Sequence, residues 1–172
     1  AGEARTVFVD GCGLLARWAG ASAHTIVELG FGLGVNFLET LRAWRRAPER
    51  PPRLDYVSIE RHLLSPEQMR VAHEALGLCD PDAAALRERL PVALPGLHRI
   101  AFDAGRVTLT LAIGDARVLV PRLVPGVDSF YLDGFAPARN PEMWGGELVR
   151  GLARLARPGA MLATYSAAAQ VR

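Results

Sequence analysis

Three glycines stand at alternate positions after a short apolar run, and a glutamate precedes them: Glu28, Gly30, Gly32 and Gly34. Glycine lets the backbone bend sharply and approach a ligand closely, so such a turn at a strand end is typical of a cofactor cradle. A dinucleotide-binding turn needs the spacing GxGxxG, and neither register of this loop supplies its third glycine. The spacing GxGxG instead favours S-adenosylmethionine, which has no pyrophosphate and whose methionine ammonium could face Glu28. A glycine-rich turn without a ligand is the alternative for this motif alone.

Three further polar residues are predicted to bind the same cofactor. Glu60 closes the second predicted strand, where its two oxygens can accept hydrogen bonds from both ribose hydroxyls. The alternative is a surface glutamate paired with Arg61. Asp115 follows the third predicted strand and can accept from the adenine amino group, cap the next helix, or do both. Asn36 is expected at the N-cap or in the first turn of the helix after the glycine loop.

The most unusual segment is the string YLDGFAP at 131–137, followed by NPEMW at 140–144. An acid at a strand end, followed by an aromatic residue and a proline, resembles in logic the acid-Pro-Pro-aromatic tetrapeptide of amine-methylating enzymes. Attack on a sulfonium methyl needs a neutral amine with a free lone pair. Asp133 could orient that nitrogen and stabilise the cationic product, and positioning supplies most of the rate of such a transfer. The alternatives are that Asp133 caps a turn and that Trp144 belongs to the core.

Short β-like runs alternate with helix-like segments, which favours an α/β fold with a parallel sheet covered by helices on both faces. The predicted strands cover residues 25–29, 54–59, 106–113, 127–132 and 160–164, with an edge hairpin possible through 97–102. The predicted helices cover 36–46, a segment from Ser65 to about Gly77, 81–90, a short stretch up to about 123, 141–156, and a last helix that begins at Ser166. Pro158 and Gly159 are predicted to form a turn.

Two regions are expected along the chain. Residues 1–24 are predicted to form a small β-rich lead-in, and residues 25–172 a Rossmann-like methyltransferase domain. A complete methyltransferase sheet usually has seven strands. The prediction of about five therefore suggests a sheet that is incomplete at its C-terminal end.

Composition excludes several other classes of protein. With 172 residues, half of them hydrophobic, one compact domain is expected, and no run approaches the roughly 20 apolar residues of a membrane helix. We therefore expect a soluble, cytoplasmic protein. Cys12 and Cys79 form no CxxC pair, the four histidines show no metal-ligand spacing, and Ser166 lies in no GxSxG frame. The net charge of +2 is too small to imply nucleic-acid binding, but the basic residues, all arginine, leave RNA binding open.

Beyond these patterns, the chain resembles the methyltransferase domains of the MnmC family, which act in tRNA 5-methylaminomethyl-2-thiouridine biosynthesis. The resemblance runs through nearly the whole chain, and the string LDGFAPARNPEMW is its most specific part. The other matching motifs are TVFV with Gly11, ELGFGLGVNFL, SIE at 58–60, GDA at 114–116, LATY at 162–165 and the closing Val171-Arg172. Family members usually have threonine at the positions of Leu29 and Leu33 and lysine at that of Arg139.

The resemblance implies a class I methyltransferase that moves a methyl group from S-adenosylmethionine to the amine of 5-aminomethyl(-2-thio)uridine at the tRNA wobble position. In many bacteria this domain is fused to an FAD-dependent oxidoreductase. Nothing in these residues binds flavin. The resemblance therefore implies tRNA as one partner, and as another a separate FAD-dependent oxidoreductase or the enzymes of the aminomethyl pathway. Two alternatives stay open: a methyltransferase of the same fold that acts on another amine, and a non-catalytic binding module derived from such an enzyme.

The resemblance also assigns residue roles. Asp133 would position the reacting nitrogen, whereas Glu28, the three glycines, Asn36, Glu60 and Asp115 would hold the cofactor. The implied substrate site comprises Phe135, Pro137, Arg139, Asn140 and Trp144. The aromatic residues and Asn140 would shape a pocket for a flipped base, and Arg139 would contact phosphate.

Overall fold

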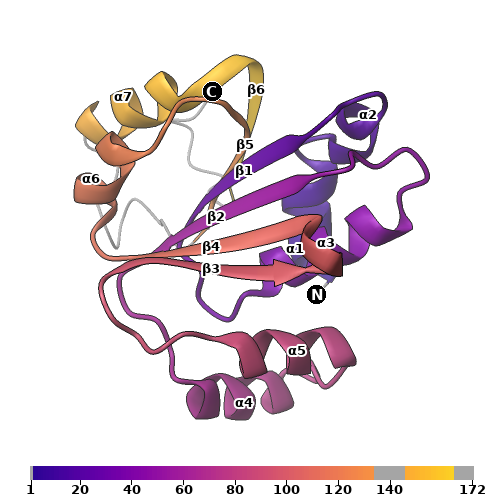
Figure 1. Cartoon of the computed structure of the whole chain (residues 1–172), viewed down its shortest axis with the longest axis vertical. Helices are drawn as coiled ribbons and strands as arrows, with labels where there is room; N and C mark the ends of the chain where they lie inside the picture. Colours follow the sequence, from indigo (N-terminus) through magenta and orange to yellow (C-terminus); the bar gives the residue numbers. More distant parts are fainter. Residues whose placement is uncertain (1, 134–145, 165–172) are drawn as a thin grey trace.

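The computed structural model describes residues 2–133 and 146–164, and within them six strands form one sheet in the order β3-β4-β2-β1-β5-β6 (Figure 1). The strands are β1 His24–Leu29, β2 Leu54–Glu60, β3 Gly96–Phe102, β4 Val107–Ile113, β5 Val127–Leu132 and β6 Ala156–Thr164. All neighbouring pairs are parallel except β3 and β4, which form the antiparallel hairpin at one edge. The α/β prediction and the edge hairpin are confirmed.

The strand order creates a switch point beside β1. From β1 the chain moves outward through β2 to β4 and then returns to the other side of β1 to form β5 and β6. In doubly wound sheets ligands bind at such a point, beyond the carboxyl ends of the strands. The register pairs Leu29 with Leu132, so the residues that follow, Gly30 and Asp133, leave the sheet side by side. The fold thus brings together two features that lie about a hundred residues apart in sequence.

Helices cover both faces of the sheet. Figure 1 shows α1, α2 and α3 on one side of the strands, and α6 and α7 together on the other. Their bounds are α3 Val35–Arg46, α4 Pro66–Ala75, α5 Pro81–Arg89, α6 Ala116–Leu119 followed by the short helix η3 Val120–Arg122, and α7 Gly146–Leu155. Alternate strand residues serve the two faces: Ile26 packs in the cluster that contains α3, and Val27 in the cluster that contains α7. Burial on both faces explains why β1 has little polar alternation.

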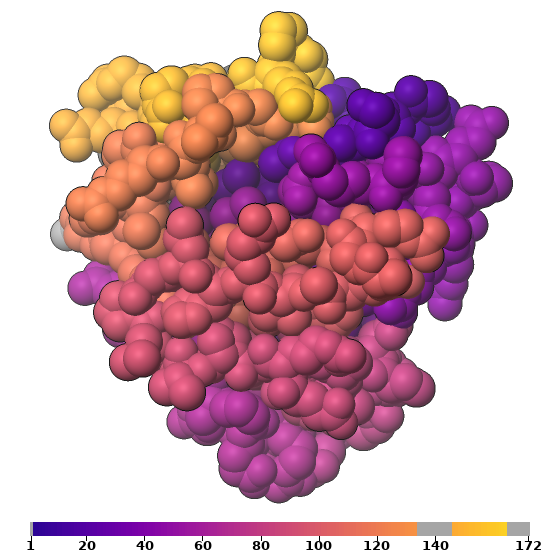
Figure 2. Space-filling view, in the orientation of Figure 1, coloured from indigo at the N-terminus to yellow at the C-terminus, as the bar shows by residue number. Residues whose placement is uncertain are grey.

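Helices α4 and α5 pack on each other and form one end of the molecule (Figures 1 and 2). Their starts carry strong capping signals. Ser65 and Gln68 form a reciprocal capping box with Pro66 at the first position, and the Asp80 side chain caps α5 ahead of Pro81. The predictions of helices beginning at these two prolines are confirmed.

The N-terminal segment differs from its prediction. It is helical rather than β-rich, with α1 Gly2–Ala4, a π-helical turn η1 Arg5–Asp10 and α2 Leu14–Trp18. A short apolar run such as TVFV fits a strand or a buried helix equally well by periodicity alone. In the structure the run is helical, and Phe8 is fully buried with its ring 4.8 Å from that of Tyr131.

Strand β6 begins earlier than predicted. Its pairing with β5 shifts between Val127 and Ser129, and the expected turn at Pro158 and Gly159 lies within this irregularity of the strand. The start of the helix predicted at 141–156 and the helix predicted from Ser166 fall outside the described residues. None of the helices in the described ranges is long and apolar enough to cross a membrane.

Candidate cofactor and amine site at the carboxyl edge of the sheet

The glycine loop is wedged between the ends of two neighbouring strands. Gly30 has a φ of 91° and donates its N–H to the Ile59 carbonyl oxygen at 2.8 Å. A Cβ at Gly30 would lie 2.8 Å from the Asp133 carbonyl oxygen. At Gly34 it would lie 2.8 Å from both Leu86 and Phe31. Close packing against backbone therefore requires glycine at position 30, whereas at position 34 the φ of 69° favours glycine and the neighbouring side chains could move.

Gly32 is different, because a Cβ there would meet nothing within 4 Å. The residue is exposed and has a φ of 52°, so the loop presents bare backbone to open space at this point. Such a surface fits a ligand that must approach the main chain closely. Gly30 and Gly34 thus shape the predicted cofactor loop, and Gly32 leaves space for a ligand beside the backbone.

Glu60 lies at the end of β2 and holds the glycine loop. Its Oε2 accepts hydrogen bonds from the backbone N–H groups of Phe31 (3.0 Å) and Gly32 (3.1 Å), and its Oε1 accepts from that of His62 (2.8 Å). The alternative pairing with Arg61 is not found, because Arg61 lies 3.9 Å from Asp115 instead. A carboxylate has about four acceptor positions, so Glu60 retains capacity for a ribose hydroxyl.

Asp115 caps helix α6. Its Oδ1 accepts from the Arg117 N–H at 2.9 Å, and its Oδ2 lies 2.7 Å from the Arg117 guanidinium. Hydrogen bonds from the Arg117 side chain and backbone lower the pKa of Asp115 to about 2. The capping alternative is therefore confirmed, and contact with adenine stays a prediction. Gly114 donates to the Glu60 carbonyl oxygen at 2.9 Å, which places Asp115 beside Glu60 along the edge of the sheet.

Glu28 does not face the crevice, which corrects the expectation that its carboxylate meets the methionine ammonium. The side chain is completely buried. Its Oε1 accepts from Asn36 Nδ2 at 2.8 Å, and its Oε2 lies 2.6 Å from Ser58 Oγ. Burial is the main cause that raises the pKa of Glu28 to about 8. Glu28 is thus an internal support rather than a surface for a ligand.

Asp133 follows β5 at the switch point and is half-buried. Its Oδ2 accepts from Asn36 Nδ2 at 2.7 Å. Its Oδ1 accepts no hydrogen bond from the described part of the chain. Among the described residues, Asn36 thus holds one carboxylate oxygen and nothing donates to the other, as an amine-orienting group requires.

Asn36 joins these two acids. It lies in the first turn of α3, as predicted, and is 4% exposed. Its Oδ1 is buried and has no hydrogen-bond partner within residues 2–133 and 146–164. A buried acceptor without a donor is costly in a finished site, and a bound ligand is one source of the missing donor.

No sequence pattern pointed to His73, which supports the glycine loop from α4. The side chain is fully buried, and its Nε2 lies 2.8 Å from the Leu33 carbonyl oxygen. Arg87 Nη1 lies 2.9 Å from Nδ1. A guanidinium can only donate, so Nδ1 accepts and the proton sits on Nε2, which donates to Leu33. Ser58 was also missed, although its register opposite Glu28 on the neighbouring strand would have pointed to it.

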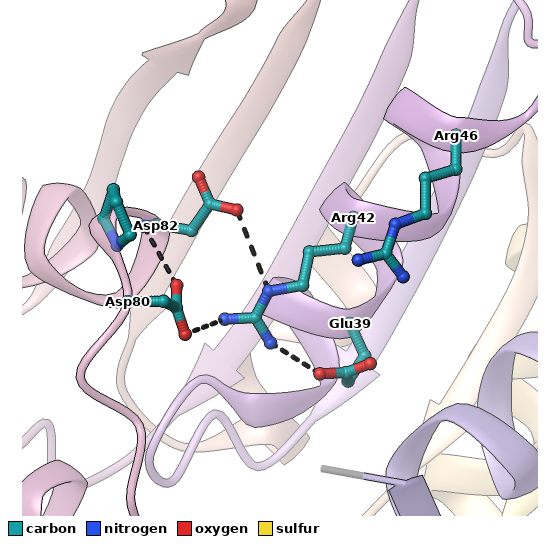
Figure 3. A pocket seen from close by; sticks show the side chains of 6 residues that line it. Glu39, Arg42, Arg46, Asp80 and Asp82 are labelled. Carbon is teal, nitrogen blue, oxygen red and sulfur yellow. Dashed lines mark hydrogen bonds and ion pairs between the residues drawn. The ribbon is translucent and has the colours of Figure 1, made fainter.

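A hollow of about 510 Å³ lies away from these residues, between α3 and the start of α5 (Figure 3). Its charges neutralise one another: the Arg42 guanidinium lies 2.6 Å from Asp80 and 3.7 Å from Asp82, and also contacts Glu39. Asp80 in turn caps α5. Paired charges of this kind fasten α5 to α3.

Other predicted site residues cannot be placed. Phe135, Pro137, Arg139, Asn140 and Trp144 lie outside the described residues. Within residues 2–133 and 146–164, no three His, Cys, Asp or Glu side chains gather where they could hold a metal ion.

The order of the four strand ends defines a class of protein. Asp115, Glu60, the glycine loop and Asp133 follow β4, β2, β1 and β5, which are consecutive in the sheet. This row suits a long ligand with a nucleoside at one end and an amino acid at the other. A family described as S-adenosyl-L-methionine-dependent methyltransferase matches residues 80–172. The chain belongs to this family of enzymes, and S-adenosylmethionine is its cofactor.

Two similar proteins carry the name MnmC, and one similar crystal structure carries the name MNMC2. The chain is 56% identical over 170 residues to the tRNA 5-methylaminomethyl-2-thiouridine biosynthesis bifunctional protein MnmC of Cupriavidus necator, covering 99% of this chain and 26% of that protein. It is 51% identical over 170 residues to the protein of the same name from Ralstonia nicotianae, with the same coverage. The crystal structure of MNMC2 from Aquifex aeolicus superposes with a TM-score of 0.70 at 26% identity, covering 96% of this chain and 50% of that one. The chain thus spans about a quarter of the length of these curated relatives.

Proposed function

We propose that this chain methylates the amine of 5-aminomethyl(-2-thio)uridine at the tRNA wobble position and so forms the 5-methylaminomethyl nucleoside. The observation that carries the proposal is the Asp133 carboxylate, held by Asn36 beside the glycine loop at the switch point. The relatives named for tRNA 5-methylaminomethyl-2-thiouridine biosynthesis support this choice of substrate.

Bound S-adenosylmethionine supplies an electrophilic methyl group on a positively charged sulfur. Transfer of that methyl group would form an N–C bond from the amine lone pair and break the S–C bond, whose electron pair would remain on sulfur. Asp133 accepts a hydrogen bond from the amine N–H, which turns the lone pair toward the methyl group and stabilises the positive charge that develops on nitrogen. The positively charged nitrogen then releases one proton to water, and the product leaves as a secondary amine.

The proposal extends to partners and place. Asp133 can orient only an amine that is already free, so an earlier reaction must expose the aminomethyl group. We propose that an FAD-dependent oxidoreductase, or an enzyme of the aminomethyl pathway, supplies it. A tRNA substrate would place the reaction in the cytoplasm.

Ligand binding and methyl transfer test the proposal together. S-adenosylhomocysteine is expected to raise the melting temperature by several degrees, whereas NADH is not, because the loop lacks the third glycine of a dinucleotide site. Radiolabelled methyl groups should pass from S-adenosylmethionine to tRNA that carries 5-aminomethyl groups.

The control substrate is tRNA from cells without this modification pathway. Equal labelling of both tRNAs would favour another amine as the substrate. Cofactor binding without any transfer would favour the non-catalytic module, and a melting shift with NADH alone would reverse the assignment of the cofactor.

A further inference from the structure

One amide nitrogen bridges the two acids at the centre of the site. Asn36 Nδ2 lies 2.8 Å from Glu28 Oε1 and 2.7 Å from Asp133 Oδ2. The three residues come from α3, from β1 and from the end of β5. An NH₂ group has two hydrogens, so this nitrogen donates one to each carboxyl group and has none to spare.

This bridge fixes the orientation of the amide. If the Asn36 side chain were turned over, its Oδ1 would face two acceptor oxygens, and the Asp133 carboxylate would lose a donor. Glu28 therefore fixes the amide: it accepts one hydrogen of Asn36 Nδ2, so that the other hydrogen points to Asp133. Glu28 itself is held from the far side by Ser58, whose Oγ lies 2.6 Å from Oε2.

We propose that Asn36 is a positioning residue for the methyl-transfer step, which holds the Asp133 carboxylate in its working orientation, and that the buried Glu28 carboxyl group fixes the Asn36 amide for this task. This inference rests on the proposed function of Asp133. It assigns Glu28 a role that involves no contact with the cofactor.

The protonation of Glu28 supports this arrangement. Burial raises the pKa of Glu28 to about 8, and the nearby Asp133 adds to the shift, although hydrogen bonds from Ser58 and Asn36 oppose it. The other titratable groups that face Glu28 are the phenols of Tyr56 and Tyr131, whose own pKa values burial raises well above 10. At neutral pH Glu28 is then an uncharged acid. Its proton lies on Oε2, which faces Ser58 Oγ at 2.6 Å, so Oε1 stays an acceptor for Asn36 and Glu28 does not repel Asp133.

Replacement of Asn36 by alanine tests the positioning role. We expect kcat to fall about 100-fold, because a loosely held carboxylate no longer orients the amine, while the Kd for S-adenosylmethionine changes less than about threefold. Thr40→Val is the matched control. Thr40 is buried in the next turn of α3 and donates to the Asn36 carbonyl oxygen at 2.7 Å, but does not touch Asp133. An Asn36→Ala enzyme with an unchanged kcat, or with a loss confined to cofactor affinity, would overturn the proposal.

The pH dependence of kcat in the variant Glu28→Gln tests whether a neutral Glu28 fixes the Asn36 amide. Glutamine keeps an acceptor for Asn36 and cannot ionise, so its kcat should match that of the wild type below about pH 8. Above that pH the kcat of the wild type should drop below that of the variant, because Glu28 becomes an anion beside Asp133. The ratio of the two rates cancels the titration of the amine substrate. A ratio that stays flat with pH would contradict the role given to Glu28.

A second readout of Glu28 needs no tRNA. The folded-state pKa of about 8 lies above the ordinary value of 4.5, so Glu28 ionises first in the unfolded chain. Stability is therefore lost as pH rises from about 4.5 to about 8. In urea denaturation the midpoint of the wild type should fall over this range relative to that of Glu28→Gln. This shift is expected even if the wild type fails to methylate tRNA, so it separates a failure of this inference from a failure of the proposed function. If the midpoints of the two proteins change in parallel with pH, Glu28 is not neutral in the folded chain.

Discussion

Replacement of Asp133 by asparagine is expected to slow methyl transfer by roughly 1,000-fold, while binding of S-adenosylmethionine survives almost unchanged. Asparagine has nearly the shape of aspartate, and its carbonyl oxygen can still accept from Asn36. It loses the negative charge that stabilises the nitrogen as it becomes cationic, an effect worth two to three orders of magnitude at comparable sites. Single-turnover rates with saturating cofactor would measure the loss, and calorimetry would measure cofactor affinity. Asp133→Ala should abolish transfer for the same reason.

A matched control removes a carboxylate elsewhere on the sheet. Asp55 lies near the start of β2, at the opposite end from the switch point, and pairs with Arg53 at 2.8 Å. Asp55→Asn should leave the rate within about twofold, because a partly exposed ion pair contributes little. Undiminished turnover by Asp133→Asn would remove Asp133 from the mechanism.

The second large effect is expected at Gly30. Replacement by alanine should lower the free energy of unfolding by about 3 kcal/mol or more, because the new Cβ combines a strained φ with a backbone clash. The clash is with the Asp133 carbonyl oxygen, 2.8 Å away, so relief would require the end of β5 to move. Urea denaturation would measure the change, and activity should fall with it.

Two further glycines separate strain from cofactor binding. Gly20 and Gly32 both have positive φ, and a Cβ at either would meet nothing within 4 Å. Each alanine variant should therefore cost about 1 kcal/mol of stability. Only Gly32→Ala should also weaken S-adenosylmethionine binding, by about tenfold, because its methyl group fills the cradle. If Gly30→Ala is as stable as Gly20→Ala, the account of the loop is wrong.

Much of the fold could be predicted because its signals are local. Glycines and prolines mark the ends of the strands and helices, and the prolines at 66 and 81 open helices with capping residues before them. The candidate site followed from one rule, that residues at carboxyl ends of parallel strands meet. This rule placed Glu60, Asp115 and Asp133 on one edge without any knowledge of their partners.

The parts that could not be predicted depend on long-range packing. A central parallel strand is buried on both faces, so alternation along β1 gives no sign of where the Glu28 side chain points. That direction is set by Ser58 and Asn36, which lie on other elements. In the same way, the helical form of the N-terminal segment depends on the space that α3 and Tyr131 offer to Phe8.

The most direct test of the central claim is mass spectrometry of wobble nucleosides after reaction with the purified chain. The substrate would be tRNA from a strain that lacks this methyl transfer, incubated with S-adenosylmethionine and either the wild type or Asp133→Asn. We predict that the wild type converts 5-aminomethyl(-2-thio)uridine to a nucleoside heavier by one methylene, with the added carbon on the side-chain nitrogen, and that the variant does not. If the nucleoside stays unmethylated with wild type that is folded and binds S-adenosylmethionine, or if the methyl group is found at another position, the proposed reaction is contradicted.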